Sequence, residues 1–180
     1  MYNANTYKIS GLFSFSTNSF EDERGYFLES FSNKEFQEIA GNISFVQDNQ
    51  SLSKYGVVRG LHYQVGKFEQ SKLIRVVKGE ILDVAVDLRI ESPTKNEHIA
   101  IKLSSKNKKQ LFIPKGFAHG FSVLSDEAIV CYKVDNYYSQ NHERGIRYSD
   151  EKLNIDWLVS DKDIIVSQKD SKLPLINDLQ

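Results

Sequence analysis

The sequence predicts an all-β fold, a sandwich or barrel, and three observations favour it. Apolar and polar residues alternate with period two along several segments, and 81–89 is the clearest of them. The 180 residues suffice for one core and contain no linker, so we expect a single domain over 1–180. Turn-forming residues separate the alternating segments at short intervals, at 78–80, 92–94, 105–108 and 125–126.

The first predicted element is a short helix near 33–40, which breaks the alternating pattern. Ser32 and Glu35 have the spacing of a capping box, and Gly41 is a typical residue to end a helix. From Leu153 onward the pattern weakens again. There we expect irregular chain with a few helical turns.

The predicted strands lie between these two regions. In 81–89, four apolar side chains fall on one face, while Asp83 and Asp87 fall on the other. The same alternation predicts strands at 98–103, 110–113 and 128–134.

Composition excludes several classes of function. A formal net charge of −1, without a basic tract, argues against a nucleic-acid partner. The one cysteine, Cys131, excludes an internal disulfide and fits a reducing compartment; it reads as a small buried side chain. No apolar run is long enough to span a membrane, and the first residues do not resemble a signal peptide. We therefore expect a cytoplasmic protein without a membrane partner.

Two of the four histidines, His62 and His119, lie in apolar, glycine-containing strand segments. A titratable side chain is costly to bury there, so this placement indicates an active site. Gln64 shares a strand face with His62, and its amide is a poor ligand for a transition metal. A general base is the favoured role for His62. A metal ligand and a structural histidine, bonded to a backbone carbonyl, both remain open.

Three further residues carry suitable chemistry but no decisive pattern. Tyr132 alternates with apolar neighbours, so its ring faces a core or a cavity. Lys72 begins a strand from which an ammonium can reach inward, although a surface lysine has the same pattern. Asp163 lies in a charged turn at 160–163. Spacing alone does not decide whether any of the three is functional.

A family resemblance does assign roles to them. From about residue 20 to residue 163 the chain resembles the dTDP-4-dehydrorhamnose 3,5-epimerase family, through blocks that occur in the family's order. These blocks are FEDERGYFLESF (20–31), FVQDNQS (45–51), VRGLHYQ (58–64), DVAVDLR (83–89) with SPT (92–94), PKGFAHGF (114–121) and NYY (136–138).

The resemblance implies a jelly-roll (cupin-like) β-sandwich that forms a homodimer and needs no metal or organic cofactor. It implies an isomerase that epimerises a nucleotide-linked 4-keto sugar, such as dTDP-4-dehydro-6-deoxy-glucose, to dTDP-4-dehydrorhamnose. His62 then resembles the general base, Asp163 its carboxylate partner, and Tyr132 the acid on the opposite face. Lys72 would stabilise the enolate oxygen. The positions similar to substrate-binding ones are Arg24, Glu29, Gln47, Asn49, Arg59, His119, Tyr138, Glu143 and Lys162, with Tyr138 stacking on the base.

The chain departs from the family pattern in two places. Ser71 stands before Lys72 where many members have glycine, and 139–147 match loosely, which weakens the assignment of Glu143. Other readings therefore stay open: epimerisation at C3 alone, or of a GDP-4-keto-heptose in capsule synthesis. A non-catalytic nucleotide-sugar binding jelly roll and a metal-dependent jelly-roll enzyme are the alternatives outside this reaction.

Overall fold

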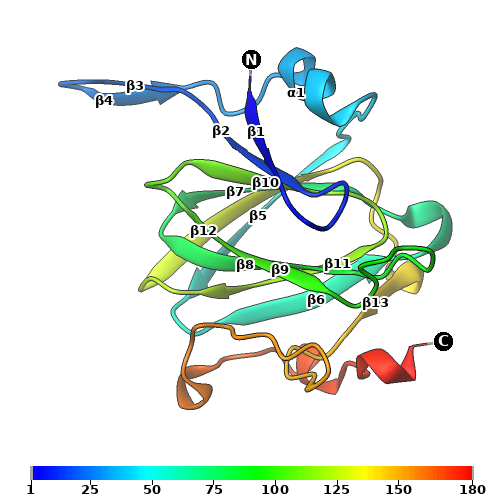
Figure 1. The fold of residues 1–180 in the computed structure, drawn as a ribbon. Helices are drawn as coiled ribbons and strands as arrows, with labels where there is room; N and C mark the ends of the chain where they lie inside the picture. The colour runs from blue at the N-terminus through cyan, green and yellow to red at the C-terminus, as the bar shows by residue number, and fades with distance from the viewer. Residues whose placement is uncertain (1, 180) are drawn as a thin grey trace.

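A computed structural model describes residues 2–179 and shows two antiparallel sheets that face each other (Figure 1). One sheet has six strands in the order β1-β2-β10-β7-β12-β5. Their bounds are β1 (Asn3–Thr6), β2 (Phe13–Ser16), β10 (Lys109–Ile113), β7 (Lys72–Lys78), β12 (Glu127–Val134) and β5 (Gln47–Lys54).

The second sheet has five strands in the order β13-β6-β11-β8-β9. Their bounds are β13 (Glu143–Gly145), β6 (Val58–Gln64), β11 (Phe117–Val123), β8 (Glu80–Asp87) and β9 (His98–Ser104). A separate hairpin of β3 (Ser19–Asp22) and β4 (Gly25–Leu28) extends sideways from the sandwich (Figure 1). The predicted all-β jelly roll is confirmed, and the predicted strands at 98–103, 110–113 and 128–134 correspond to β9, β10 and β12.

The predicted helix is also confirmed, as α1 (Asn33–Ala40), which buries Phe36 in an aromatic cluster. Gly41 ends it with φ of 75°, a left-handed conformation that glycine adopts without strain. The expected capping box does not form. The Ser32 side chain makes no capping hydrogen bond, and the Ser32 backbone N–H donates to Tyr2 Oη at 2.7 Å.

Both faces of β8 are buried, which differs from the half-polar strand that alternation predicts. Ile81 and Ala85 belong to the core between the sheets, whereas Leu82, Val84 and Val86 belong to a second core cluster. Asp83 therefore points into the protein and is fully buried. Alternation identifies the two faces of a strand but not what covers each of them.

The chain after residue 150 covers the outer face of the five-stranded sheet (Figure 1). It supplies Leu153, Trp157 and Ile176 to the second core cluster. It is irregular chain interrupted by short 3₁₀ turns, as expected from Leu153 onward, at Asp161–Asp163, Asp170–Lys172 and Ile176–Asp178; two more such turns lie earlier, at Gly66–Phe68 and Gln140–His142. No helix among the described residues is long and apolar enough to cross a membrane.

Candidate active site

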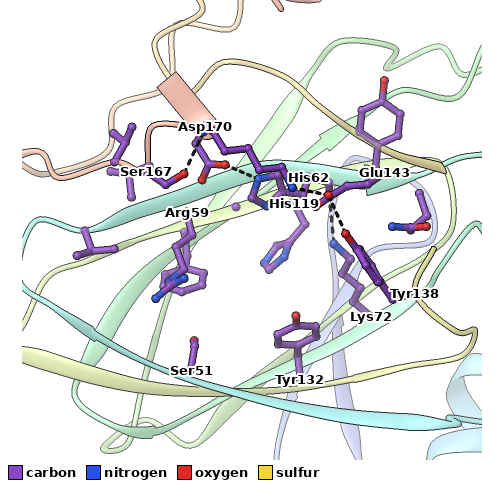
Figure 2. A pocket seen from close by; sticks show the side chains of 18 of the residues that line it. Ser51, Arg59, His62, Lys72, His119, Tyr132, Tyr138, Glu143, Ser167 and Asp170 are labelled. Carbon is purple, nitrogen blue, oxygen red and sulfur yellow. Dashed lines mark hydrogen bonds and ion pairs between the residues drawn. The ribbon is translucent and has the colours of Figure 1, made fainter. Parts of the chain in front are cut away.

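A cavity of about 530 Å³ lies between the two sheets and is closed on one side by the C-terminal chain (Figure 2). This volume is in the range of sites for small organic ligands. The six-stranded sheet contributes Ser51, Lys72 and Tyr132 to its wall. The five-stranded sheet contributes His62 and His119, so the predicted residues of both sheets meet in one space.

His62 is held by a carboxylate from the C-terminal chain. Its Nε2 lies 2.8 Å from Asp170 Oδ1, and the Gly60 N–H donates to Asp170 Oδ2 at 3.3 Å. Burial raises the pKa of Asp170, but the hydrogen bonds from His62, Gly60 and Ser167 outweigh it and hold the pKa below its usual value. An ionised carboxylate can only accept, so Nε2 of His62 carries the hydrogen and Nδ1 is the basic nitrogen.

The predicted pairing of His62 with Asp163 is therefore not the one that forms. Asp163 does not line the cavity, and neither does Lys162; both lie on the 3₁₀ turn Asp161–Asp163, where Asp163 stands beside the backbone of Gly56. The pattern Ser-X-Lys-Asp occurs twice in the chain, at 160–163 and at 167–170. Only the second copy brings its lysine and its aspartate to the cavity, as Lys169 and Asp170. The duplication is the sequence signal that could have identified Asp170.

His119 also bonds to a carboxylate, but within its own sheet. Its Nε2 lies 2.9 Å from Asp83 Oδ1, and both side chains are almost completely buried. Burial lowers the pKa of His119 more than Asp83 raises it, so this imidazole is neutral near pH 7. Sequence analysis identified His119 but placed Asp83 on a polar face, and so missed this pair.

Lys72 brings a desolvated cation to the same cavity. Its Nζ donates to the His62 carbonyl at 3.2 Å. Desolvation lowers its pKa to about 8, although the charges of Asp83 and Glu143 oppose the shift. The ammonium form still predominates at pH 7, so Lys72 places a positive charge beside the two histidines.

Tyr132 stands on the wall opposite His62, with its ring directed into the cavity (Figure 2). Burial raises the pKa of the phenol, although the Arg59 guanidinium lowers it. Arg59 also lines the cavity, and its Nε donates to Ser53 Oγ at 2.9 Å. A neutral phenol thus faces a basic imidazole across one cavity.

A second carboxylate joins two loops at the mouth of the cavity. Glu143 Oε2 accepts a hydrogen bond from Tyr138 Oη at 3.0 Å (Figure 2). The same oxygen pairs with the Lys169 ammonium. Burial raises the pKa of Glu143, but these two partners bring it below its usual value. The predicted residues Tyr138 and Glu143 therefore lie at the cavity, joined by Lys169, which sequence analysis missed.

The remaining predicted substrate-binding residues do not line this cavity. Gln47 and Asn49 share the face of β5 that carries Ser51, and Gln47 Nε2 donates to Asn49 Oδ1 at 2.8 Å. Arg24 and Glu29 belong to or directly follow the β3–β4 hairpin, where both are exposed. The sandwich of a single chain thus leaves these two apart from the other predicted residues.

No cluster of three or more potential metal-ligating side chains occurs among the residues that the structure describes. Beside His62 on the strand, Gln64 is buried, and its Oε1 accepts the Ser139 N–H at 3.1 Å. Gln64 therefore anchors the loop that leads to Tyr138.

Comparisons with known proteins agree with this architecture. A family model described as dTDP-4-dehydrorhamnose 3,5-epimerase matches residues 6–178. The chain is 53% identical over 163 residues to the Shigella flexneri dTDP-4-dehydrorhamnose 3,5-epimerase, covering 87% of this chain and 90% of that protein. A crystal structure of a dTDP-6-deoxy-D-glucose-3,5-epimerase from Legionella pneumophila, in complex with dTDP-4-keto-L-rhamnose, matches with a TM-score of 0.96 and 44% identity, covering 100% of this chain and 95% of that one. A dTDP-4-dehydrorhamnose 3,5-epimerase structure from Elizabethkingia anophelis matches with a TM-score of 0.93 and 43% identity, covering 98% and 97% of the two chains.

Proposed function

The chain belongs to the dTDP-4-dehydrorhamnose 3,5-epimerase family, and we propose that the cavity between its sheets is where it acts. The protein is an isomerase that epimerises a dTDP-linked 4-keto sugar, converting dTDP-4-dehydro-6-deoxy-glucose to dTDP-4-dehydrorhamnose. One observation carries the assignment of the site. A basic imidazole nitrogen on one wall faces a protonated phenol on the other, and the Lys72 ammonium lies in the same cavity.

The roles follow from the chemistry of a proton next to a ketone. His62 Nδ1 removes the proton from C3 or C5, and Asp170 stabilises the imidazolium that results. The electrons move onto the C4 oxygen, where the Lys72 ammonium stabilises the enolate. Tyr132 returns a proton from the opposite face, which inverts the carbon. The high pKa of this phenol keeps it protonated until the carbanion, a far stronger base, needs the proton.

The nucleotide would lie toward the cavity mouth. Arg59 and Lys169 supply positive charge there, suited to a diphosphate, and Tyr138 supplies an exposed ring for the base. Gln47 and Asn49 are further along the strand that carries Ser51, within the same face. A sugar held at the closed end would then place its ring between His62 and Tyr132, near His119.

We propose a homodimer in which the partner copy completes this site. The β3–β4 hairpin carries Arg24 away from the cavity of its own chain (Figure 1). It exposes Phe20 and Phe27 by 67% and 70%, unusually large apolar surfaces for a hairpin without a core of its own. A symmetric pair would cover these rings and bring the partner's Arg24 to the nucleotide.

Mixing Arg24→Ala with His62→Ala subunits tests this arrangement: activity returns in the mixture if the site is shared, and stays absent if it is not.

Two smaller proposals complete the assignment. We take residues 1–180 as one domain, since the C-terminal chain supplies both Asp170 and part of a core cluster. We also place the protein in the cytoplasm, where the free Cys131 thiol would remain reduced.

Deuterium exchange tests the function directly. The protein is incubated in heavy water with dTDP-4-dehydro-6-deoxy-glucose, with a C3- or C5-blocked analogue, and with GDP-linked 4-keto sugars, and each carbon is followed by NMR. We expect exchange at both C3 and C5 of the dTDP sugar. Exchange at C3 alone would support a one-carbon enzyme, and saturable binding without any exchange would support a binding module.

A further inference from the structure

The carboxylate that holds His62 lies on a 3₁₀ turn that belongs to neither sheet, so contacts made by the chain on both sides of this turn must fix its position. On the upstream side, the Ile165 N–H donates to the Gly56 carbonyl, and the Val58 N–H donates to the Ile165 carbonyl, both at 2.9 Å. Closer to the site, the Asp170 N–H donates to Ser167 Oγ at 3.0 Å. This anchor fixes where the chain enters the cavity but not where it leaves.

A second anchor lies downstream of Asp170 and is built around Arg147. The Arg147 N–H donates to the Pro174 carbonyl at 2.9 Å, and Arg147 Nε donates to the Leu173 carbonyl at 3.0 Å. Leu173 packs on Gly145, where an added Cβ would stand 2.7 Å from its Cδ1. Gly145 is paired with His62 across β13 and β6, so this contact is made beside the base, on the neighbouring strand.

Asp150 completes the downstream anchor, and the reaction proposed above gives it no role. It is buried, with 4% of its surface exposed. Its Oδ2 accepts the Ile176 N–H at 2.7 Å, while its Oδ1 accepts the N–H groups of Lys152 and Leu153 at 2.9 and 3.0 Å. One oxygen thus caps a local turn, and the other holds the C-terminal chain six residues beyond Asp170.

We propose that Asp150 and Arg147 are positioning residues that act through Asp170, by fixing the register in which the C-terminal chain crosses β6 and β13. This inference rests on the proposed function, because it assumes that Asp170 supports His62 in the reaction. It assigns a purpose to a buried carboxylate and a guanidinium that neither bind substrate nor touch the reacting atoms.

The duplicated motif explains why register needs such control. Residues 160–163 and 167–170 both read Ser-X-Lys-Asp, so local sequence offers two lysine–aspartate pairs seven residues apart. A slip of one residue moves an extended chain by roughly 3.3 Å. A displacement of about 1 Å at a reacting group can already lower a rate by about 100-fold. Anchors on both sides of Asp170 prevent such a shift.

Asp150→Asn separates the two duties of this side chain. An asparagine has one acceptor oxygen, so it can cap the turn or hold Ile176 but not both. Asp156→Asn is the control for the local duty alone, because the exposed Asp156 accepts the Leu158 N–H at 2.9 Å, two residues on, just as Asp150 accepts the Lys152 N–H. We expect Asp150→Asn to lower kcat by about 30-fold with a smaller change in KM, and Asp156→Asn to change kcat by less than about 2-fold.

A double-mutant cycle with Asp170→Asn distinguishes positioning from general loss of stability. If Asp150 acts through Asp170, adding Asp150→Asn to Asp170→Asn lowers kcat by less than about 2-fold further. A full additional 30-fold loss in that background would overturn the inference, and so would a wild-type kcat in Asp150→Asn alone. Circular dichroism and thermal unfolding show whether each variant folds. If Asp150→Asn does not fold, Arg147→Ala enters the same cycle with the same two outcomes.

The proposed function and this inference fail in different ways. A wild-type protein without exchange activity would contradict the proposed function. The inference alone would be contradicted if the wild type is active and Asp170→Asn lowers kcat, but Asp150→Asn lowers kcat by the same factor with or without Asp170→Asn.

Discussion

The two histidines of the cavity receive their carboxylates from different parts of the molecule. His119 is on β11, and its partner Asp83 is on the adjacent β8, so sheet register alone brings them together. His62 is on β6, and its partner Asp170 is separated from it by 108 positions, on chain that belongs to neither sheet. The His62 side chain is 30% exposed, whereas that of His119 is 9% exposed.

The difference indicates that the two histidine–carboxylate pairs have different roles. A buried histidine with a lowered pKa, locked between neighbouring strands, suits a fixed neutral hydrogen-bonding group. A histidine at the cavity surface, with an ionised carboxylate behind it, suits a base that must gain and lose a proton in every turnover.

Removing each imidazole gives the largest expected effects. We expect His62→Ala to lower kcat by about 10³-fold or more, because proton abstraction loses its base. We expect His119→Ala to lower kcat by about 10 to 100-fold, because it removes the neutral hydrogen-bonding group that we propose lies next to the sugar. Steady-state kinetics and carbon-resolved deuterium exchange measure both. Calorimetric titration with dTDP serves as the control, since the nucleotide contacts should survive in both variants; equal losses of kcat would remove the contrast.

Substitutions of the carboxylate partners, Asp170 and Asp83, should lower kcat by less than substitutions of the histidines. We expect Asp170→Asn to lower kcat by about 100-fold, because it removes the charge that stabilises the imidazolium of His62. Asp83→Asn should cost about 10-fold, because its partner His119 stays neutral throughout. The measurement is kcat for both variants at one pH. A larger loss of kcat in Asp83→Asn than in Asp170→Asn would mean that His119, and not His62, is the base.

The pH dependence tests the Lys72 ammonium, which shares the cavity with both histidines. Desolvation lowers the pKa of Lys72 to about 8, so the ammonium is present below that pH and is lost as the pH rises through it. Activity should therefore fall on the alkaline side with a midpoint near 8. Asp83 raises the pKa of Lys72, so Asp83→Asn should move this midpoint to lower pH. Lys72→Arg should abolish the decline, because a guanidinium stays charged; a decline that persists in Lys72→Arg would belong to another group.

Much of this architecture could be predicted from the sequence, and the rest fails for identifiable reasons. Period-two patterns located β9, β10 and β12, because such patterns are local, and Gly41 located the end of α1, although the capping box expected at its start does not form. Asp83 was misplaced because alternation does not report that the C-terminal chain covers the apolar face of β8. The partner of His62 was misassigned because Ser-X-Lys-Asp occurs twice, and only tertiary anchoring selects the second copy.

The two copies of that motif give the smallest expected effects and the sharpest contrast. Asp163→Asn and Lys162→Ala alter side chains outside the cavity, so we expect kcat and KM to change by less than about 2-fold. Lys169→Ala, the matched change in the second copy, removes the partner of Glu143 and a positive charge at the mouth. It should raise KM by about 10-fold while kcat changes less, because a contact to the diphosphate acts on binding. A large loss of kcat in Asp163→Asn would mean that Asp163, from the first copy, supports His62 in the reaction. The chain would then cross β6 in a different register when substrate is bound.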